Sequence, residues 1–289
     1  MAATTPTTTS VCRALWLAAT LVAIVWHQWV DGCIQAIWDV LRASTVVRHD
    51  TFEPTVAVTA FLVSFTFWKA LDCWLPAGLT KRWRIGESDD MSTWHLSKWW
   101  TRLLQEPVWY FAPIAIFDIM YPRRNLPEKA PSIEKLAIDI LAPLFIYDFM
   151  FFFIHVTCHK VRFLYRNIHA KHHSEKIMRA GETIRLSFFE QWADVSCSII
   201  AVNVARCHPL SRALYNGIIV YLLTELHSGY DMPWMLQNVV PFGLWAGSRR
   251  HYVHHRDGRF YYQKFFCYLD DFFGFGEDAR ASIRTGKEN

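Results

Sequence analysis

Charged residues are scarce in this 289-residue chain, where Asp, Glu, Lys and Arg together make up 19% of the sequence, against about 25% in an ordinary globular domain. The basic residues are dispersed and the net charge is only +4, which argues against a nucleic-acid partner. The seven cysteines are scattered, odd in number and without a Cys-x-x-Cys pair. They do not fit a disulfide framework or a zinc knuckle.

Several catalytic motifs are also missing from the sequence. There is no Gly-x-Ser-x-Gly motif and no glycine-rich phosphate loop, which makes a hydrolase of those types a poor fit. The paired Glu-x-x-His motifs of carboxylate di-iron bundles are absent too. Apart from the first ten residues the chain has no low-complexity region, repeat or long linker, so one membrane-embedded domain is the simplest description.

Hydrophobic residues make up 52% of the chain and aromatic residues 16%, a profile typical of proteins that contact lipid. Four apolar stretches occupy the first half, at residues 14–30, 55–75, 108–121 and 136–156. A bilayer crossing needs about 17–25 apolar residues. The second and fourth stretches qualify, the first is marginal, and the third is short unless it begins near Leu103. We therefore predict an all-α integral membrane protein with about four transmembrane helices.

The first stretch is compatible with a signal peptide. A retained anchor is favoured because no small-residue cleavage site clearly follows, and because Trp26 and Trp29 suit a membrane interface. The basic segment 76–107 favours a cytosolic position for that segment, for both termini and for the histidines described below. The basic residues of segment 122–135, which this orientation places in the lumen, argue against it. Two shorter apolar runs, 195–205 and 213–226, are predicted to cap the site from the cytosolic side.

Histidines are concentrated in the second half of the chain, where nine of the thirteen fall between His155 and His255. Residues three and four apart lie on one face of a helix, so each cluster can aim its imidazoles at one point. Neutral imidazole binds zinc, iron and copper, and nine ligands suit two ions better than one. The sequence thus predicts a dinuclear site from His155, His159, His169, His172, His173, His227, His251, His254 and His255. The other four, predicted to lie at the surface or an interface, are His27, His49, His95 and His208.

Asp148 lies inside the fourth apolar stretch, seven residues before His155 and on the same helical face. An acidic residue there costs about 2.5–3.5 kcal/mol on the insertion scale, which makes it a candidate functional residue. We expect its carboxylate to accept the second N–H of a ligand imidazole. The alternative is a hydrogen bond between helices.

The metal pair is best interpreted as redox-active, because structural zinc needs four ligands and often uses cysteine. Two irons that activate dioxygen near a membrane would oxidise a C–H bond of a lipid. Apolar helices around the site would admit such a substrate from the bilayer and keep water out.

The histidine boxes resemble those of the fatty acid hydroxylase and sterol desaturase superfamily. The resemblance rests on the segments His155-Val-Thr-Cys-His159, Leu164 to His173, His227-Ser-Gly-Tyr-Asp-Met-Pro-Trp234 and His251-Tyr-Val-His-His255. It covers about residues 107–276 and divides the chain into an N-terminal membrane region, 1–106, a catalytic region, 107–276, and a tail, 277–289. It implies that the nine histidines hold two irons, which zinc can replace, and that Glu190 and Asp270 lie just outside them.

The resemblance also implies a multi-pass enzyme of the endoplasmic reticulum membrane, with its histidine boxes facing the cytosol. It uses dioxygen and electrons from NAD(P)H, delivered through a reductase and cytochrome b5. Oxygen insertion into a sterol is the favoured reaction. Sterol C4-methyl oxidation, sterol or fatty-acyl desaturation and a non-catalytic sterol- or metal-binding protein are the alternatives, and the oligomeric state stays open. Two positions depart from the family, Tyr261 in place of an asparagine and Leu269 in place of a tryptophan, and this edge is predicted to shape the substrate pocket.

Overall fold

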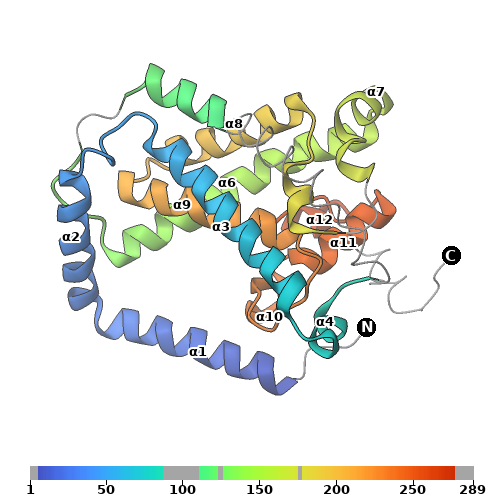
Figure 1. The fold of residues 1–289 in the computed structure, drawn as a ribbon, viewed down its shortest axis with the longest axis horizontal. Helices are drawn as coiled ribbons and strands as arrows, with labels where there is room; N and C mark the ends of the chain where they lie inside the picture. Colours follow the sequence, from blue (N-terminus) through green and yellow to red (C-terminus); the bar gives the residue numbers. More distant parts are fainter. Residues whose placement is uncertain (1–5, 87–110, 123–125, 175–177, 277–289) are drawn as a thin grey trace.

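The protein is a bundle of long helices with a group of short helices at one end (Figure 1). The computed structural model describes residues 6–86, 111–122, 126–174 and 178–276, and within these ranges it contains no β-strand, only two isolated β-bridges. The predicted all-α class is therefore confirmed. The helices of the first part of the chain are α1 (Pro6–Val25), α2 (His27–Ala43), α3 (Phe52–Trp74), α4 (Ala77–Trp83), a helix at Phe111–Met120 and α6 (Ile133–Lys160).

The second part of the chain alternates short helical turns with two longer helices. These elements are α7 (Arg162–Leu164), the π-helix η1 (Tyr165–His169), the 3-10 helices η2 (His172–Ser174) and η3 (Ala180–Ile184), α8 (Phe188–Val204), α9 (Pro209–Leu226), α10 (Leu236–Val239), the 3-10 helix η4 (Pro241–Gly243), α11 (Gly247–Asp257) and α12 (Tyr268–Phe272).

Three helices of the described residues are long and apolar enough to cross a membrane, namely α1, α3 and α6. About four had been predicted. The third apolar stretch forms only the short helix Phe111–Met120, and its suggested start near Leu103 lies outside the described residues. Helix α1 is exposed along its length, and Arg13 Nε donates to the carbonyl of Asn238, at 2.9 Å, which ties its beginning to α10. Trp26 and Trp29 are exposed, as an interface position requires.

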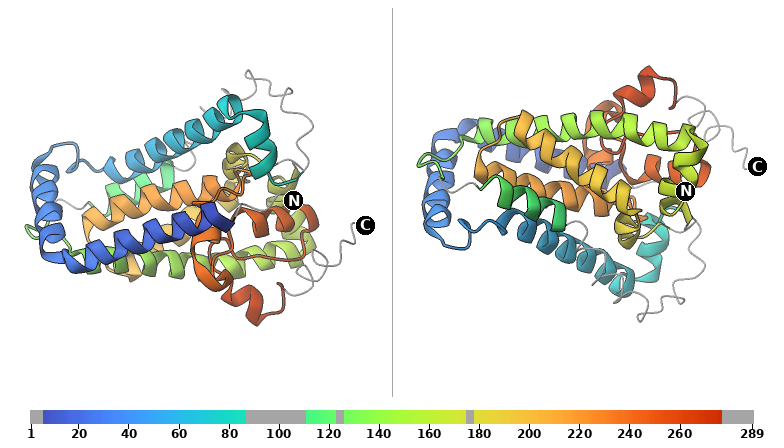
Figure 2. Two further views of the ribbon diagram at one scale, coloured as in Figure 1. Left: turned by 90° about the horizontal axis from the view of Figure 1, so that it is seen from below. Right: turned by 90° about the horizontal axis from the view of Figure 1, so that it is seen from above.

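Helices α3, α6 and α9 run in the same direction, and α8 runs against them (Figure 2). At one end of the bundle Glu53 pairs with Arg212, which joins the beginnings of α3 and α9. At the other end the hydroxyl of Tyr230, just after α9, donates to Asp72 near the end of α3, at 2.7 Å. The backbone N–H of His208 donates to Asp139 in the first part of α6, at 3.0 Å.

The two shorter apolar runs thus differ from their prediction. They form α8 and α9, which belong to the bundle, and α9 packs against both α3 and α6. Most side chains of α9 are buried against these neighbours, including Arg212 near its start, whereas α8 keeps exposed apolar side chains such as Phe189 and Val204. The structure over the histidines is built instead from α7, η1, η2 and α11.

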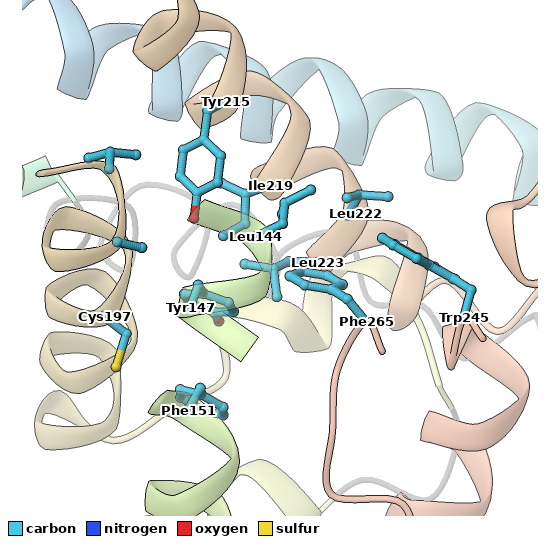
Figure 3. Close-up of a cluster of buried hydrophobic side chains, with 12 residues drawn as sticks. Leu144, Tyr147, Phe151, Cys197, Tyr215, Ile219, Leu222, Leu223, Trp245 and Phe265 are labelled. Carbon is cyan, nitrogen blue, oxygen red and sulfur yellow. The ribbon is translucent and has the colours of Figure 1, made fainter. Parts of the chain in front are cut away.

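Aromatic and aliphatic side chains form the core between α6, α8 and α9. Figure 3 shows Ile219 and Leu223 of α9 facing Leu144 and Tyr147 of α6, with Phe265 beside them. A second cluster joins Phe61, Phe65 and Trp68 of α3 to Tyr230, Met232 and Met235. Large aromatic side chains bury about 150–250 Å² each. This packing fixes the ends of α6 and α9, where the histidines begin.

Candidate metal centre

The first two histidine boxes lie where α6 ends. His155 and His159 are one turn apart in the last turns of α6. The chain then turns through α7 into the π-helix η1, in which the N–H of Ala170 donates to the carbonyl of Tyr165, at 2.7 Å. Such wide turns are frequent at functional sites because they change the helical register. Here the wide turn places His169 against His159, and η2 then supplies His172 and His173.

The remaining ligand candidates come from α9 and α11. His227 caps the end of α9, and α11 carries His251, His254 and His255. Gly258 ends α11 with a positive φ of 64°, and its N–H donates to the carbonyl of His254. Glycine adopts this left-handed conformation without the steric cost that other residues bear.

The nine predicted histidines gather into two adjacent groups. In each group the ligand nitrogens all lie within 4.8 Å of one another. The five-histidine group contains His155, His159, His169, His173 and His254, and the four-histidine group contains His172, His227, His251 and His255. Four histidines were predicted to lie at the surface or an interface instead. Of these, His27 and His49 are exposed and His208 caps α9, while His95 lies outside the described residues.

Hydrogen bonds on the outer side of the rings select which nitrogen faces inward. Nδ1 of His155 donates to the carbonyl of Tyr262, at 2.7 Å, that of His254 to Phe260, at 2.8 Å, and that of His227 to Leu223, at 2.8 Å. A neutral imidazole that donates from Nδ1 keeps a lone pair on Nε2. The carbonyls therefore orient three candidate ligand atoms, in the manner usual for metal-binding histidines.

Several imidazole nitrogens that face the interior of the two groups have no hydrogen-bond donor or acceptor of ordinary kind among the described residues. Nε2 of His155, His159 and His254 is buried without a hydrogen bond. Other Nε2 atoms face each other, at 2.9 Å between His227 and His251 and 3.0 Å between His251 and His255. Buried polar atoms without a partner are costly, and nitrogen lone pairs at such distances require a proton or a cation between them. The donor set therefore fits two metal ions.

Burial keeps these imidazoles neutral, which is the form that binds metal. Desolvation, with neighbouring imidazoles as the next cause, lowers the pKa of His172, His251, His254 and His255 well below the usual value of 6.5. Desolvation also lowers the pKa of His173 and of His227 to about 3. Near neutral pH these six rings carry no proton that a metal would have to displace.

The acidic residues predicted outside the ligands take two different places. Glu190, near the start of α8, accepts from Nδ1 of His169 at 2.7 Å, and both side chains are buried. Asp270 accepts from the backbone N–H of Tyr262, at 2.8 Å, and of Gln263, at 3.0 Å. It therefore fixes the segment whose carbonyl orients His155.

Asp148 does not accept from an imidazole, contrary to the expectation. Its carboxylate accepts from the side chain of Gln263 and from the backbone N–H groups of Lys264, Phe265 and Phe266, at 2.9–3.2 Å. The reason is that segment 262–266 packs against Asp148 of α6, so that backbone N–H groups and not an imidazole lie within hydrogen-bond distance of the carboxylate. Asp148 and Asp270 thus hold the same segment.

Three buried polar side chains beside the centre were not singled out from the sequence. Nζ of Lys264 donates to Asp194 at 2.6 Å and to the hydroxyl of Tyr147 at 2.7 Å, and Tyr147 also donates to Asp194. The sequence feature that could have indicated this group is a lysine within the aromatic run 260–266, because a buried ammonium needs an acidic partner. Its partners, on α6 and α8, carry no motif that would have identified them.

Two cavities meet at this polar group. A cavity of about 320 Å³ lies against both histidine groups and is lined by His155, His169, His172, His227, His251 and Lys264, among others. A larger, mostly apolar cavity of about 850 Å³ runs between α3, α8 and α9. Thr183, Asp194 and Leu223 line both cavities. Tyr261 and Leu269, predicted to shape the substrate pocket, line neither one.

Comparison with known proteins identifies relatives over most of the chain. The family model described as fatty acid hydroxylase matches residues 140–275. A cholesterol 25-hydroxylase-like protein of Danio rerio is 30% identical over 83% of this chain and 97% of its own length. The cholesterol 25-hydroxylases of Mus musculus and Homo sapiens are 29% and 28% identical over 83% of this chain, and over 82% and 89% of their own lengths. No solved structure gives a significant match.

Proposed function

The chain belongs to the fatty acid hydroxylase family, and on that premise we propose that it is a membrane-bound, dioxygen-dependent di-iron hydroxylase of a sterol. The observation that carries the proposal is that the cavity against the two histidine groups shares Thr183, Asp194 and Leu223 with an apolar cavity. Small-molecule sites are typically concave and mostly apolar with a few polar groups, and this cavity has such a lining. The names of the relatives support a sterol as the substrate.

Iron would be held by the two histidine groups, and zinc is a plausible replacement after overexpression because both metals accept imidazole ligands. When bound, the two irons supply the activation of dioxygen, whose reduction draws electrons from outside the chain. We infer that these electrons come from NAD(P)H through a reductase and cytochrome b5. The carbonyls of Tyr262, Phe260 and Leu223 keep three ligand rings in one orientation throughout the reaction.

The residues between the two cavities have a separate role in this proposal. Thr183 and Leu223 border the passage from the large cavity to the centre, and Asp194 places its carboxylate there. The ammonium of Lys264 neutralises that carboxylate. The passage therefore admits an apolar substrate without presenting an uncompensated charge. The surrounding core excludes water from the reacting C–H bond, which limits side reactions of the oxidant.

The proposed location is the endoplasmic reticulum membrane, with the histidine groups on the cytosolic side. The candidate spans α3 and α6 run in the same direction (Figure 2), and α6 carries His155 and His159 in its last turns. Arg84 directly follows α4, the short helix after α3. The positive-inside rule favours a cytosolic position for that end. A glycosylation acceptor inserted near Lys176, which lies outside the described residues, should stay unmodified. Efficient glycosylation there would contradict the orientation and the access to cytosolic electron carriers.

The reaction is tested by lipid mass spectrometry of cells that express the wild-type chain or the variant His172→Ala. The wild type should produce a sterol heavier by one oxygen atom, and that atom should carry the label when the cells are supplied with isotopically labelled dioxygen. The variant should produce none, because it lacks one ligand candidate of the four-histidine group. A product lighter by two hydrogens would identify a desaturase instead, and no product with a fully loaded metal site would favour a binding protein.

A further inference from the structure

The large cavity has one polar end, and that end lies far from the metal centre. Glu53 at the start of α3, Arg212 in the first turn of α9 and Asn216 one turn further along α9 line it there. The other end reaches Thr183, Asp194 and Leu223, which it shares with the cavity at the histidines. Between the two ends the lining is largely apolar and comes from residues such as Ala57, Phe61, Val195, Ile199, Ile219 and Val220.

Asn216 is a polar side chain of this end that has no hydrogen-bond partner among the described residues. It is 8% exposed and lines the cavity. No described residue makes a hydrogen bond to its side-chain amide, whereas the amides of Gln191 and Asn203 each donate to a backbone carbonyl. An amide that both donates and accepts is suited to a ligand group that does the same.

The charges of this end select the kind of ligand group. The guanidinium of Arg212 is engaged by Glu53 through two hydrogen bonds of 2.8 and 3.0 Å, and its third nitrogen donates to Asn203 at 3.4 Å. Asp118 lines the same region. The polar end thus holds two carboxyl groups, of Glu53 and Asp118, and one guanidinium, of Arg212. The excess of acidic groups would repel an anionic head group. A neutral hydroxyl meets no such repulsion.

Building on the proposed function, we propose that Asn216, beside the Arg212–Glu53 ion pair, binds the hydroxyl group of a lipid alcohol whose apolar end points to the metal centre. The substrate then lies along α9 inside the bundle, with its head at one end and its reacting carbon at the other. Asn216 is a binding residue in this arrangement. The Arg212–Glu53 pair is a positioning element, because it keeps the guanidinium from binding an anion in that place.

The geometry of α9 sets the distance between hydroxyl and reacting carbon. At about 1.5 Å per residue, Leu223 lies about 10 Å and His227 about 16 Å beyond Asn216 along the helix axis. The oxidised carbon must therefore be roughly that far from the hydroxyl. In a 3-hydroxysterol the C4 methyl group is attached next to the carbon that bears the hydroxyl. This binding mode thus favours oxidation of the sterol side chain and argues against C4-methyl oxidation.

The binding mode is tested with purified protein and without any turnover. The probes are radiolabelled cholesterol, radiolabelled cholestene, which is the same hydrocarbon without the hydroxyl, and radiolabelled palmitate as an anionic lipid. Wild-type protein should bind cholesterol about 10-fold more tightly than cholestene, which corresponds to one hydrogen bond. Asn216→Leu should bind both sterols alike and cholestene no worse than wild type, because leucine fills a similar volume and removes no contact to the protein.

The control is Ser196→Leu, a polar-to-leucine substitution at an exposed residue of α8 that does not line the cavity. It should keep the preference for cholesterol. The proposal is overturned if Asn216→Leu retains the preference, if Ser196→Leu loses it equally, or if palmitate binds more tightly than cholesterol and depends on Asn216. If the wild-type protein prefers cholesterol through Asn216 but inserts no oxygen, the proposed function is refuted and the binding mode is not. If the protein inserts oxygen into a sterol but does not prefer cholesterol over cholestene, the binding mode is refuted and the proposed function is not.

Discussion

Nδ1 of His169 and Oε1 of Glu190 are 2.7 Å apart, and the two side chains are 1% and 3% exposed. The contact joins the first residues of α8 to the π-helix that follows α6. It is the single carboxylate–imidazole hydrogen bond to the nine-histidine cluster that the described residues show. The other outer contacts are to carbonyl groups, so Glu190 is the residue that adds negative charge to a ligand ring and strengthens it as a donor to metal.

Glu190→Gln should lower the affinity for metal by about 10–100-fold, the usual loss for a partner of a ligand histidine. Glutamine still accepts from Nδ1 of His169 but carries no charge. Metal retained after dialysis against graded concentrations of a chelator measures the effect. Glu134→Gln, an exposed acid in the first turn of α6, should behave as wild type. Equal metal retention by both variants would contradict the role of Glu190.

The two histidine groups should lose metal independently. His251→Ala removes a donor from the four-histidine group, and His159→Ala removes one from the five-histidine group. Each variant should hold about one metal ion per chain where the wild type holds two. Elemental analysis of protein purified anaerobically in mild detergent measures this ratio. One tightly held metal in the wild type, or loss of both metals in each variant, would show that the groups do not form two separate sites.

Asp148→Asn should destabilise the fold as well as the site. The carboxylate accepts four hydrogen bonds from segment 263–266. An asparagine offers one oxygen and turns an N–H₂ group toward backbone N–H donors. Each buried donor left without a partner costs about 1–3 kcal/mol, so the thermal midpoint in detergent should fall clearly. Asp39→Asn, at a half-exposed acid of α2, should change stability by less than about 0.5 kcal/mol.

The clustering of the histidines was predictable because ligand spacing is local. His155 with His159, and His251 with His255, share a helical face whatever the rest of the chain does. The pairing of the boxes into a group of five and a group of four was not predictable, since it depends on where α6, α9 and α11 end relative to one another. The partner of Asp148 was missed for the same reason. It lies more than a hundred positions away in the sequence.

Backbone conformation explains the departure at position 261. Tyr261 has a φ of +56°, in the left-handed region that asparagine tolerates better than most residues do. The asparagine that the family resemblance implies at this position would therefore fit the turn without contact with a substrate. Here the hydroxyl of Tyr261 donates to the carbonyl of Gly276, at 3.1 Å, and its side chain is buried. A one-dimensional pattern identifies such a position but not its backbone angle.

The stability of the metal-free protein should fall as the solution becomes acidic. Below pH 6.5 the histidines of the unfolded chain become protonated, whereas the buried imidazoles of the folded chain stay neutral. Burial lowers the pKa of His173 and His227 to about 3 and that of four other rings well below 6.5. Their contribution is complete above pH 6.5 and is lost as the pH falls toward about 3. Each ring contributes up to about 1.4 kcal/mol per pH unit.

Asp270 acts in the opposite direction, since burial raises its pKa from 3.8 to about 7. Its protonated form favours the folded state, so its contribution is present below pH 3.8 and is lost as the pH rises through about 7. Burial likewise raises the pKa of Glu225 from 4.5 to about 7. These two groups oppose six histidines. The free energy of unfolding of the metal-free protein should therefore decrease between about pH 6.5 and 4. The slope should be smaller in His173→Asn/His227→Asn, and a flat profile in the wild type would contradict the neutral, buried cluster.

Gly229→Ala should disrupt the four-histidine group although residue 229 is not a ligand candidate. Gly229 has a φ of +74°, and a Cβ at this position would lie 2.5 Å from the carbonyl oxygen of Met178. Backbone atoms on both sides must then move, and His227 lies two residues away. Metal content should fall and the thermal midpoint should drop. Gly217→Ala is the matched control, because it lies within α9 with open space at its Cβ. That substitution should be neutral or stabilise the helix by up to about 1 kcal/mol, and equal losses in both variants would refute the steric argument.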